Sequence, residues 1–149
     1  MKEKDEILKH FREIHLKFSK FYARVLTQTN LTLPQYALLN LLANEGMIPM
    51  TEASEKLYIT KPAVTHLVDQ LEKNSLLKRA RHLKDRRVYL LEIQPKGKKA
   101  VSAIQDEVFK YLLTTFRQFD ARSKKVIMKF NSLLAQTMDK FLIEADHND

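Results

Sequence analysis

The sequence contains no cysteine among its 149 residues. This absence excludes disulfide bonds, thiolate metal sites, a cysteine nucleophile and a thiol-based redox sensor. Glycine and proline are also scarce, with 2 and 4 residues, whereas 30% of the residues are charged. Such a composition is typical of a helix-rich chain and not of a turn-rich β-sandwich. Because 44% of the residues are hydrophobic, the chain has enough apolar material for a core, and we expect a globular, mainly α protein.

Long apolar runs are missing as well. No stretch approaches the roughly 20 residues that a membrane-spanning helix requires. The opening MKEKDEILKH places acidic residues where a secretory signal carries cations and then an apolar core. We therefore expect a cytoplasmic protein that has no membrane partner.

Catalytic motifs are absent too. The sequence has no Gly-rich phosphate loop, no cluster of metal-ligand residues and no nucleophile beside an evident base. His10 and His15 would diverge on a helix, because only side chains three or four positions apart share a face. We expect neither an enzyme nor a cofactor nor a metal site.

Positive charge is concentrated in one part of the chain. Residues 61–99 contain 11 Lys and Arg against 4 Asp and Glu, whereas the segments before and after are nearly neutral. Clustering of this kind indicates a polyanionic partner such as nucleic acid. The alternative is an ordinary solvated surface, which usually mixes both signs.

The spacing of apolar residues predicts several helices. The first extends through KDEILKHFREIHLKFSKFYARVLTQT and has a wider apolar stripe than a small lobe needs. A second helix is expected between Pro34 in its first turn and Gly46 beyond its end. Thr51 is expected to cap a brief third helix.

The next helix follows Thr60, a plausible cap, and buries one side through Val64, Leu67, Val68 and Leu71. Its other side is polar, with small residues that permit close approach to a partner. Two short helices with this division predict a helix-turn-helix whose second helix faces DNA. The alternative is an ordinary amphipathic surface helix.

A basic hairpin is expected immediately afterwards, with strands over Leu76–His82 and Arg87–Ile93. Its tip HLKDR lacks Gly and Asn, so we expect an open loop and not a two-residue turn. Two further amphipathic helices follow, the second capped by Asp120, and with the first helix they predict an all-helical lobe.

In order and spacing, these segments resemble the MarR family of winged-helix transcriptional regulators over nearly the whole chain. LPQYALLNLLA is similar to the family's second helix, MTEASEKLYITKPAVTHLVDQLEKNSLL to its helix-turn-helix, and DRRVYLLEIQPKGKKAV to its wing and fifth helix. The resemblance implies a mainly α fold with a small β-wing, a winged helix-turn-helix plus a helical dimerisation lobe. It also implies a homodimer, with dimerisation helices in residues 1–32 and 96–149 around a DNA-binding domain in residues 33–95.

The resemblance implies contacts with double-stranded DNA through two elements. TKPAVTHLVDQLE would lie in the major groove and RHLKDRR beside the minor groove, where Asp85 and Arg87 match the family's Asp-x-Arg motif. Thr65 and His66 are expected on bases or on phosphate alone, and several cations on phosphates. The candidate DNA-binding residues are Lys61, Pro62, Thr65, His66, Gln70, Arg79, Arg81, Lys84, Asp85, Arg86 and Arg87.

The sequence departs from the family pattern at four positions. Tyr58 stands where Gly often closes the first short helix, so we expect a turn conformation that a tyrosine tolerates. His66 and Gln70 stand where Arg is frequent, and Gln94 replaces a common Thr cap. Because Arg pairs with guanine and Gln with adenine, the base preference is not carried over.

The resemblance also implies a small aromatic or anionic effector, for which His15, Tyr22, Arg24, Tyr36 and Tyr111 are candidate contacts. The alternative is that the tyrosines belong to the core with hydroxyls in solvent. We expect a ligand-responsive repressor on a palindromic operator with half-sites about 10 base pairs apart. The rival functions are a winged-helix interaction module and a basic helical dimer that binds nucleic acid without sequence preference.

Overall fold

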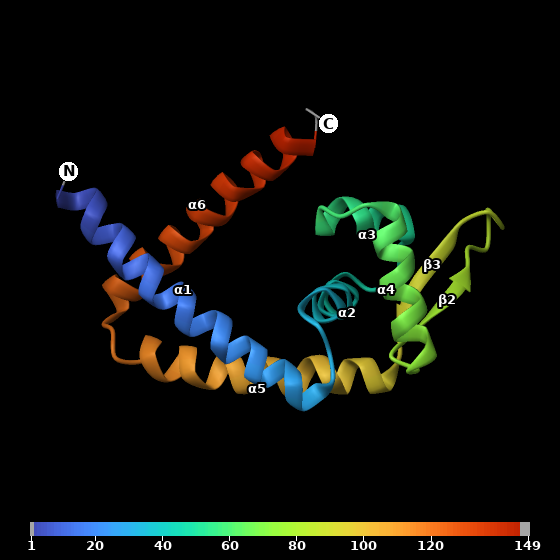
Figure 1. The fold of residues 1–149 in the computed structure, drawn as a ribbon, viewed down its shortest axis with the longest axis horizontal. Coiled ribbons are helices and arrows are strands. Elements are labelled where there is room, and N and C mark those ends of the chain that lie inside the picture. The colour runs from blue at the N-terminus through green and yellow to red at the C-terminus, as the bar shows by residue number, and fades with distance from the viewer. Residues whose placement is uncertain (1, 147–149) are drawn as a thin grey trace.

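The computed structural model describes residues 2–146, and the side chains of residues 2–143. In this part of the chain it contains six helices and three short strands (Figure 1). The expected mainly α fold with a small β-wing is confirmed. Within the described residues, no helix combines the length and apolar character needed to cross a bilayer. The elements in chain order are α1 Lys2–Thr29, α2 Leu33–Glu45, β1 Ile48–Pro49, α3 Met50–Leu57, α4 Lys61–Lys73, β2 Leu77–Arg81, β3 Tyr89–Ile93, α5 Pro95–Phe116 and α6 Ala121–Asp146.

Helix α2 has defined signals at both ends. The Thr32 hydroxyl accepts a hydrogen bond from the Gln35 backbone N–H at 3.4 Å, and Gln35 Oε1 accepts one from the Thr32 backbone N–H at 2.9 Å. This reciprocal capping box satisfies two N–H groups that the helix leaves unpaired. Pro34 lies in the first turn and Gly46 follows the last, with a φ of 83°. The predicted start and stop of this helix are confirmed.

Helices α3 and α4 form the predicted helix-turn-helix. The Thr60 hydroxyl accepts a hydrogen bond from the Ala63 N–H at 3.3 Å, which confirms Thr60 as a cap. The prediction that Thr51 caps α3 is wrong, because this helix begins at Met50 after an extended Pro49 and has no side-chain cap. Thr51 lies inside the first turn, where its carbonyl accepts a hydrogen bond from the Ser54 hydroxyl at 2.7 Å.

Tyr58 ends α3 in the left-handed region, at φ 53° and ψ 43°. The expectation that this turn adopts a conformation suited to a tyrosine is wrong. The turn keeps the conformation that glycine adopts readily, which costs other residues about 1–2 kcal/mol. Its geometry is imposed by the backbone, since the Tyr58 N–H donates to Glu55 O and the Ile59 N–H to Ser54 O, both at 3.2 Å.

The three strands form an antiparallel sheet in the order β1-β3-β2. Leu77 pairs with Ile93 and Arg81 with Tyr89. Strand β2 is one residue shorter than predicted at each end, and β3 begins two residues later than predicted and ends at Ile93 as predicted. Residues 82–88 form the open loop that the sequence predicted. Strand β1 was not predicted because two residues carry no periodic signal, although Ile48 and Pro49 pair with β3.

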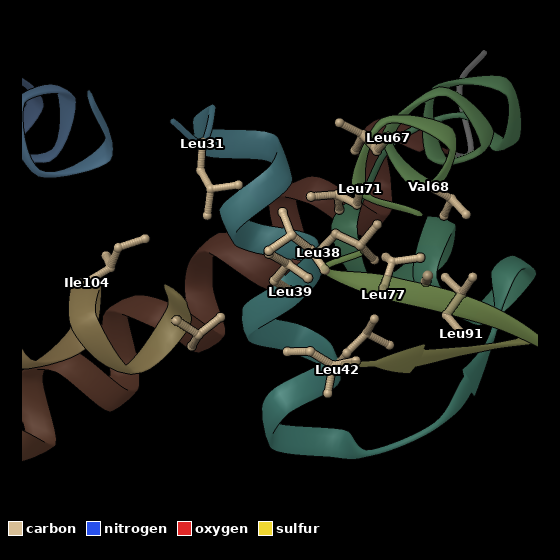
Figure 2. Close-up of a cluster of buried hydrophobic side chains, with 14 of the residues drawn as sticks. Leu31, Leu38, Leu39, Leu42, Leu67, Val68, Leu71, Leu77, Leu91 and Ile104 are labelled. Atoms are coloured by element: carbon tan, nitrogen blue, oxygen red, sulfur yellow. The ribbon is translucent and has the colours of Figure 1, made fainter. Parts of the chain in front are cut away.

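The hydrophobic core is centred on α2. Leu38 and Leu39 have no exposed surface, and they meet the buried face of α4 and the inner side of the sheet (Figure 2). The four residues predicted to be buried in α4 are all buried, which confirms the orientation of that helix. The N-terminal half of α5 adds Val101, Ile104 and Val108, whereas α1 contributes only its last turns. The core therefore belongs to the winged-helix lobe, residues 31–108.

The outer parts of three helices lack such a core. We call residues 2–18, residues 109–116 and α6 the helical arm. Large apolar side chains are exposed along it, among them Ile7 (59%), Phe130 (61%) and Phe141 (70%), and no described side chain of α6 is buried. Figure 1 shows α1 leading away from the lobe toward the N-terminus, and α6 rising as a separate helix from the far end of α5 toward the C-terminus. One chain alone does not cover this apolar surface.

Gly97, in the first turn of α5, permits an unusually close approach between this helix and the sheet. A Cβ atom at this position would lie 2.2 Å from the Leu76 carbonyl oxygen and 2.9 Å from the Ile93 side chain. The same carbonyl accepts a hydrogen bond from the Gln94 N–H at 2.9 Å. The start of α5 is thereby held directly against the end of the helix-turn-helix.

Candidate nucleic-acid interface

The outer side of α4 carries short polar groups in solvent. Lys61, Pro62, Thr65 and His66 are all exposed, while the opposite side of the helix is buried. The Thr65 hydroxyl donates to the Lys61 carbonyl at 3.1 Å, which fixes its rotamer and leaves its lone pairs available as acceptors. The structure therefore places the predicted base-contact residues on one accessible surface.

Gln70, unlike those residues, has both of its side-chain polar atoms engaged with other protein side chains. Its Oε1 accepts a hydrogen bond from Gln35 Nε2 at 2.9 Å, and its Nε2 lies 3.0 Å from His66 Nε2. Gln70 thus connects the first turn of α2 to His66. The prediction placed Gln70 on DNA, and the free protein gives both of its polar atoms protein partners.

Arg79 also differs from the free phosphate contact that the sequence suggested. Its guanidinium bonds to Asp69 and Glu72 of α4, and its backbone N–H donates to Glu72 at 3.0 Å. Burial alone lowers the pKa of Arg79, but the hydrogen bonds to the two carboxylates outweigh burial and raise it. Arg79 therefore joins β2 to the DNA-facing helix.

The wing tip is organised by two side chains that accept backbone hydrogen bonds. His82 Nδ1 accepts from the N–H groups of Lys84 and Asp85 at 3.2 Å each. Asp85 Oδ1 accepts from the Arg87 backbone N–H at 3.0 Å. In the free protein the Asp85 carboxylate therefore binds the main chain of Arg87 and not its guanidinium. That interaction shapes the loop instead.

Four cations at the wing have no counter-charge. No acidic side chain among residues 2–143 pairs with Arg81, Lys84, Arg86 or Arg87, all of which are exposed. Elsewhere in the lobe, Lys78 pairs with Glu92 at 2.9 Å and Lys56 with Glu45 at 3.3 Å. Figure 1 shows α4 and the hairpin together at one end of the molecule, away from the helical arm. The unpaired charge therefore lies at the same end of the molecule as α4 and its exposed polar side.

The candidate effector residues do not form one cluster. Arg24 and Tyr111 line a hollow of about 820 Å³ between α1 and α5, together with Phe18 and Phe21. Tyr22 instead lies on a second hollow beside the start of α2, and its ring centroid is 6.5 Å from that of Tyr36.

Burial, with Tyr22 nearby, raises the pKa of Tyr36, so its hydroxyl remains protonated at neutral pH. His15 is exposed and is not among the lining residues of either hollow. The candidate set is therefore divided between two sides of α1.

The sequence interpretation missed three interface residues. Gln35 was treated only as part of a helix, although Thr-x-x-Gln at its start is the signature of a capping box. The carboxylates of Asp69 and Glu72 were not recognised as partners of Arg79, because no local spacing rule connects α4 with β2.

Comparison with known proteins agrees with this architecture. A model of the MarR family matches residues 31–89. The uncharacterized HTH-type transcriptional regulator YsmB of Bacillus subtilis is 29% identical over 114 residues, which are 76% of this chain and 78% of the relative. The structure of a MarR family protein from Bacillus stearothermophilus is 26% identical and superposes with a TM-score of 0.78 over 92% of this chain and 96% of that one. Residues 31–89 thus match the MarR family in sequence, and the described chain shares its winged-helix fold.

By its similarity to this family model and to curated regulators, the chain is a DNA-binding transcriptional regulator. Members of the family are regulators and as a rule not enzymes. NadR, which was solved in complex with 4-hydroxyphenylacetate, is 24% identical and has a TM-score of 0.70 over 88% of this chain and 91% of that one. At that identity, the similarity to NadR establishes the MarR fold alone.

Proposed function

We propose that this protein is a homodimeric repressor that occupies a palindromic operator and responds to a small aromatic anion. The observation that supports operator binding best is the proximity of the polar side of α4 to the unpaired cations of the wing. A helix of this kind fits the major groove, and cations beyond it fit phosphates and the adjacent minor groove.

The proposed contacts divide into two groups. Thr65 and His66 meet base edges, whereas Lys61, Arg81, Lys84 and Arg86 meet phosphates and Arg87 enters the minor groove. Pro62 contributes apolar surface at the start of α4, and Asp85 shapes the wing. Arg79 and Gln70 support these residues from behind.

Homodimerisation is proposed from the helical arm. A monomer rarely exposes more than a few hundred Å² of contiguous apolar surface, and the arm exposes large side chains on α1, α5 and α6. In a two-fold symmetric dimer, the apolar surface of one chain packs against the same surface of a second copy. We assign dimerisation to residues 1–32 and 96–149 and DNA binding to residues 33–95. The symmetry in turn sets half-sites about 10 base pairs apart.

An effector site is proposed at the hollow between α1 and α5. Its volume, about 820 Å³, is within the range of small-molecule sites, and aromatic rings form much of its wall. Arg24 offers a guanidinium for a carboxylate, and Tyr111 offers a hydroxyl. The compound bound by NadR, 4-hydroxyphenylacetate, is an aromatic carboxylate of suitable size. The protein represses transcription if, when bound to the operator, it excludes polymerase. The effector relieves repression if it releases the protein from the operator.

The test of DNA binding is selection of preferred duplexes from a randomised library by the full-length protein. A two-fold symmetric site is expected, bound roughly a thousandfold more tightly than a scrambled duplex at physiological salt. Lys84→Ala and Arg86→Ala should each weaken binding to both duplexes and lower the salt slope by about one. Glu55→Ala, on the exposed side of α3, serves as the control. Recovery of no preferred sequence, with steep salt dependence, would instead support the rival function of an unspecific nucleic-acid binder.

The effector proposal is tested with 4-hydroxyphenylacetate and with 4-methylphenol, which lacks the carboxylate. The acid should raise the melting temperature and weaken binding to the selected duplex, and Arg24→Gln should remove both effects. Equal responses to the two compounds would contradict a role for Arg24 in anion binding.

A further inference from the structure

A chain of hydrogen bonds leads from the backbone of α2 to the DNA-facing side of α4. It begins at the Thr32 N–H, which donates to Gln35 Oε1 at 2.9 Å, and continues from Gln35 Nε2 to Gln70 Oε1 at 2.9 Å. It ends at His66 Nε2, which lies 3.0 Å from Gln70 Nε2. We call Gln35, Gln70 and His66 the amide relay.

The direction of the amide relay is fixed at its backbone end. A backbone N–H can only donate, so the oxygen of Gln35 must face Thr32 and its NH₂ group must face Gln70. The same reasoning turns the oxygen of Gln70 toward Gln35 and its NH₂ group toward His66. Because that NH₂ group donates, His66 Nε2 must be an unprotonated acceptor. Rotation of the Gln35 amide would lose the bond to Thr32, and rotation of the Gln70 amide alone would lose the bond to Gln35.

A neutral imidazole with a bare Nε2 carries its proton on Nδ1. His66 is exposed, and within residues 2–143 its Nδ1 has no hydrogen-bond partner. The relay therefore presents a single oriented N–H donor on the polar side of α4. The neutral side chain of free histidine in water prefers the other tautomer, with the proton on Nε2, so the protein selects the less common form.

We infer that Gln35 and Gln70 are positioning residues that hold His66 as an Nδ1–H donor, and that His66 donates to N7 of a purine in the major groove. This inference rests on the proposed binding of an operator. Purine N7 is an acceptor on the major-groove edge of both guanine and adenine, whereas the corresponding group of cytosine is a donor. A single donor disfavours cytosine, which offers only a donor, and it meets thymine only at O4, beside the C5 methyl group; it does not distinguish guanine from adenine. Gln70, whose polar atoms are both engaged, does not read adenine.

The relay is tested first in the DNA-free, full-length protein by long-range ¹H–¹⁵N correlation of the imidazole rings at about pH 8, where an ordinary histidine is neutral. His66→Ala assigns the signal. The proton is expected on Nδ1 in the wild type and on Nε2 in most molecules of Gln35→Met. The matched control is Gln105→Met, because Gln105 also donates an amide hydrogen bond to α2, to Asn40 at 2.8 Å, but lies outside the relay. A proton on Nε2 in the wild type, or the same tautomer in Gln35→Met, overturns the inference.

Base contact is tested on the selected duplex by replacing its purines, one at a time, with 7-deazapurines. At one position in each half-site, the 7-deaza substitution should weaken binding of the wild type roughly fivefold to tenfold, as expected for the loss of one hydrogen bond. The same substitution should not weaken binding of His66→Ala any further. Gln35→Met should behave like His66→Ala at that position, with an unchanged salt slope. Absence of such a position refutes base contact by His66. Failure to select any duplex refutes the proposed operator binding. The tautomer of His66 is measured without DNA, so that result tests the amide relay independently of operator binding.

Discussion

The winged-helix lobe and the helical arm bury their apolar residues in different ways. In the lobe, Leu38, Leu39 and Val64 lose all exposure inside one chain. In the arm, Phe11, Phe130 and Phe141 keep 48%, 61% and 70% of theirs. The lobe therefore has a core of its own, whereas the arm presents half of one. Packing within the chain stabilises the lobe, whereas the proposed dimer would stabilise the arm by association.

The substitution with the largest expected effect weakens dimer association and leaves the lobe intact. Phe130→Asp places a charge on the apolar surface of α6, and two-fold symmetry places it twice in the dimer. Because an unpaired charge is costly to bury, the dimer dissociation constant should rise about a thousandfold, or about 4 kcal/mol. Sedimentation equilibrium measures this constant. Gln136→Asp, which adds the same charge on another side of α6, should change it little; an unchanged dimer in Phe130→Asp would refute the proposed interface.

The next effect damages the lobe and leaves association intact. Leu38→Ala opens a cavity beneath α4 and the sheet, and it should lower the free energy of unfolding by about 3 kcal/mol. Urea denaturation at two protein concentrations measures the loss, which should be the same at both. Leu33→Ala, at a position 57% exposed in the same helix, should cost under about 1 kcal/mol. Equal losses in the two variants would contradict the assignment of the core.

A smaller effect concerns backbone strain inside the lobe. Tyr58→Gly should relieve the left-handed turn after α3 and raise the free energy of unfolding by about 0.5–1 kcal/mol, less whatever packing the ring provides. Thermal unfolding measures the change. The matched substitution Tyr89→Gly, in strand β3, should destabilise the protein because glycine weakens a strand. Destabilisation by both would mean that ring contacts outweigh the strain.

The smallest effect is local to the arm and depends on pH. The backbone N–H of Ser123 donates to Asp120 at 2.7 Å and lowers the pKa of that carboxyl below 3.8. Because the pKa of Asp120 is lower in the folded protein than in the unfolded chain, its hydrogen bond stabilises the fold fully above pH 3.8. That stabilisation is lost as the pH falls through the lowered pKa of the folded state.

Protection of the Ser123 amide from hydrogen exchange should therefore decline in acid below pH 3.8. In Asp120→Asn, protection of the Ser123 amide should not decline in this way, because asparagine also caps a helix but does not titrate. The same acid dependence in both proteins would assign the loss to other carboxyls.

The helices and the orientation of α4 could be predicted because each depends on local signals. Periodic apolar residues gave the buried face of α4, and Thr60, Gly46 and Asp120 marked ends that the structure confirms. Thr51 failed as a cap because an extended Pro49 can precede a helix without any side-chain bond. Tyr58 failed because packing of two helices imposes a turn regardless of the residue that occupies it.

The sequence indicated which elements carry the candidate interface, but not the contacts among their residues. Clustered charge located α4 and the wing correctly as neighbours. The partners of Arg79 and Gln70 lie on other elements, and residues 35 and 70 meet only after the chain has folded. A cation on a basic strand therefore became a structural link, and a polar residue on the DNA-facing helix became a support for its neighbour.

The close contact at Gly97 has a mechanical consequence. With the Leu76 carbonyl bonded to the Gln94 N–H and no room for even a methyl group beside it, the first turn of α5 cannot slide relative to the start of the wing. A change in the angle at which α5 leaves the arm must then be accompanied by the same rotation of the hairpin and, through Arg79, of α4. At this contact, the first turn of α5 and the start of the wing therefore act as one packing unit.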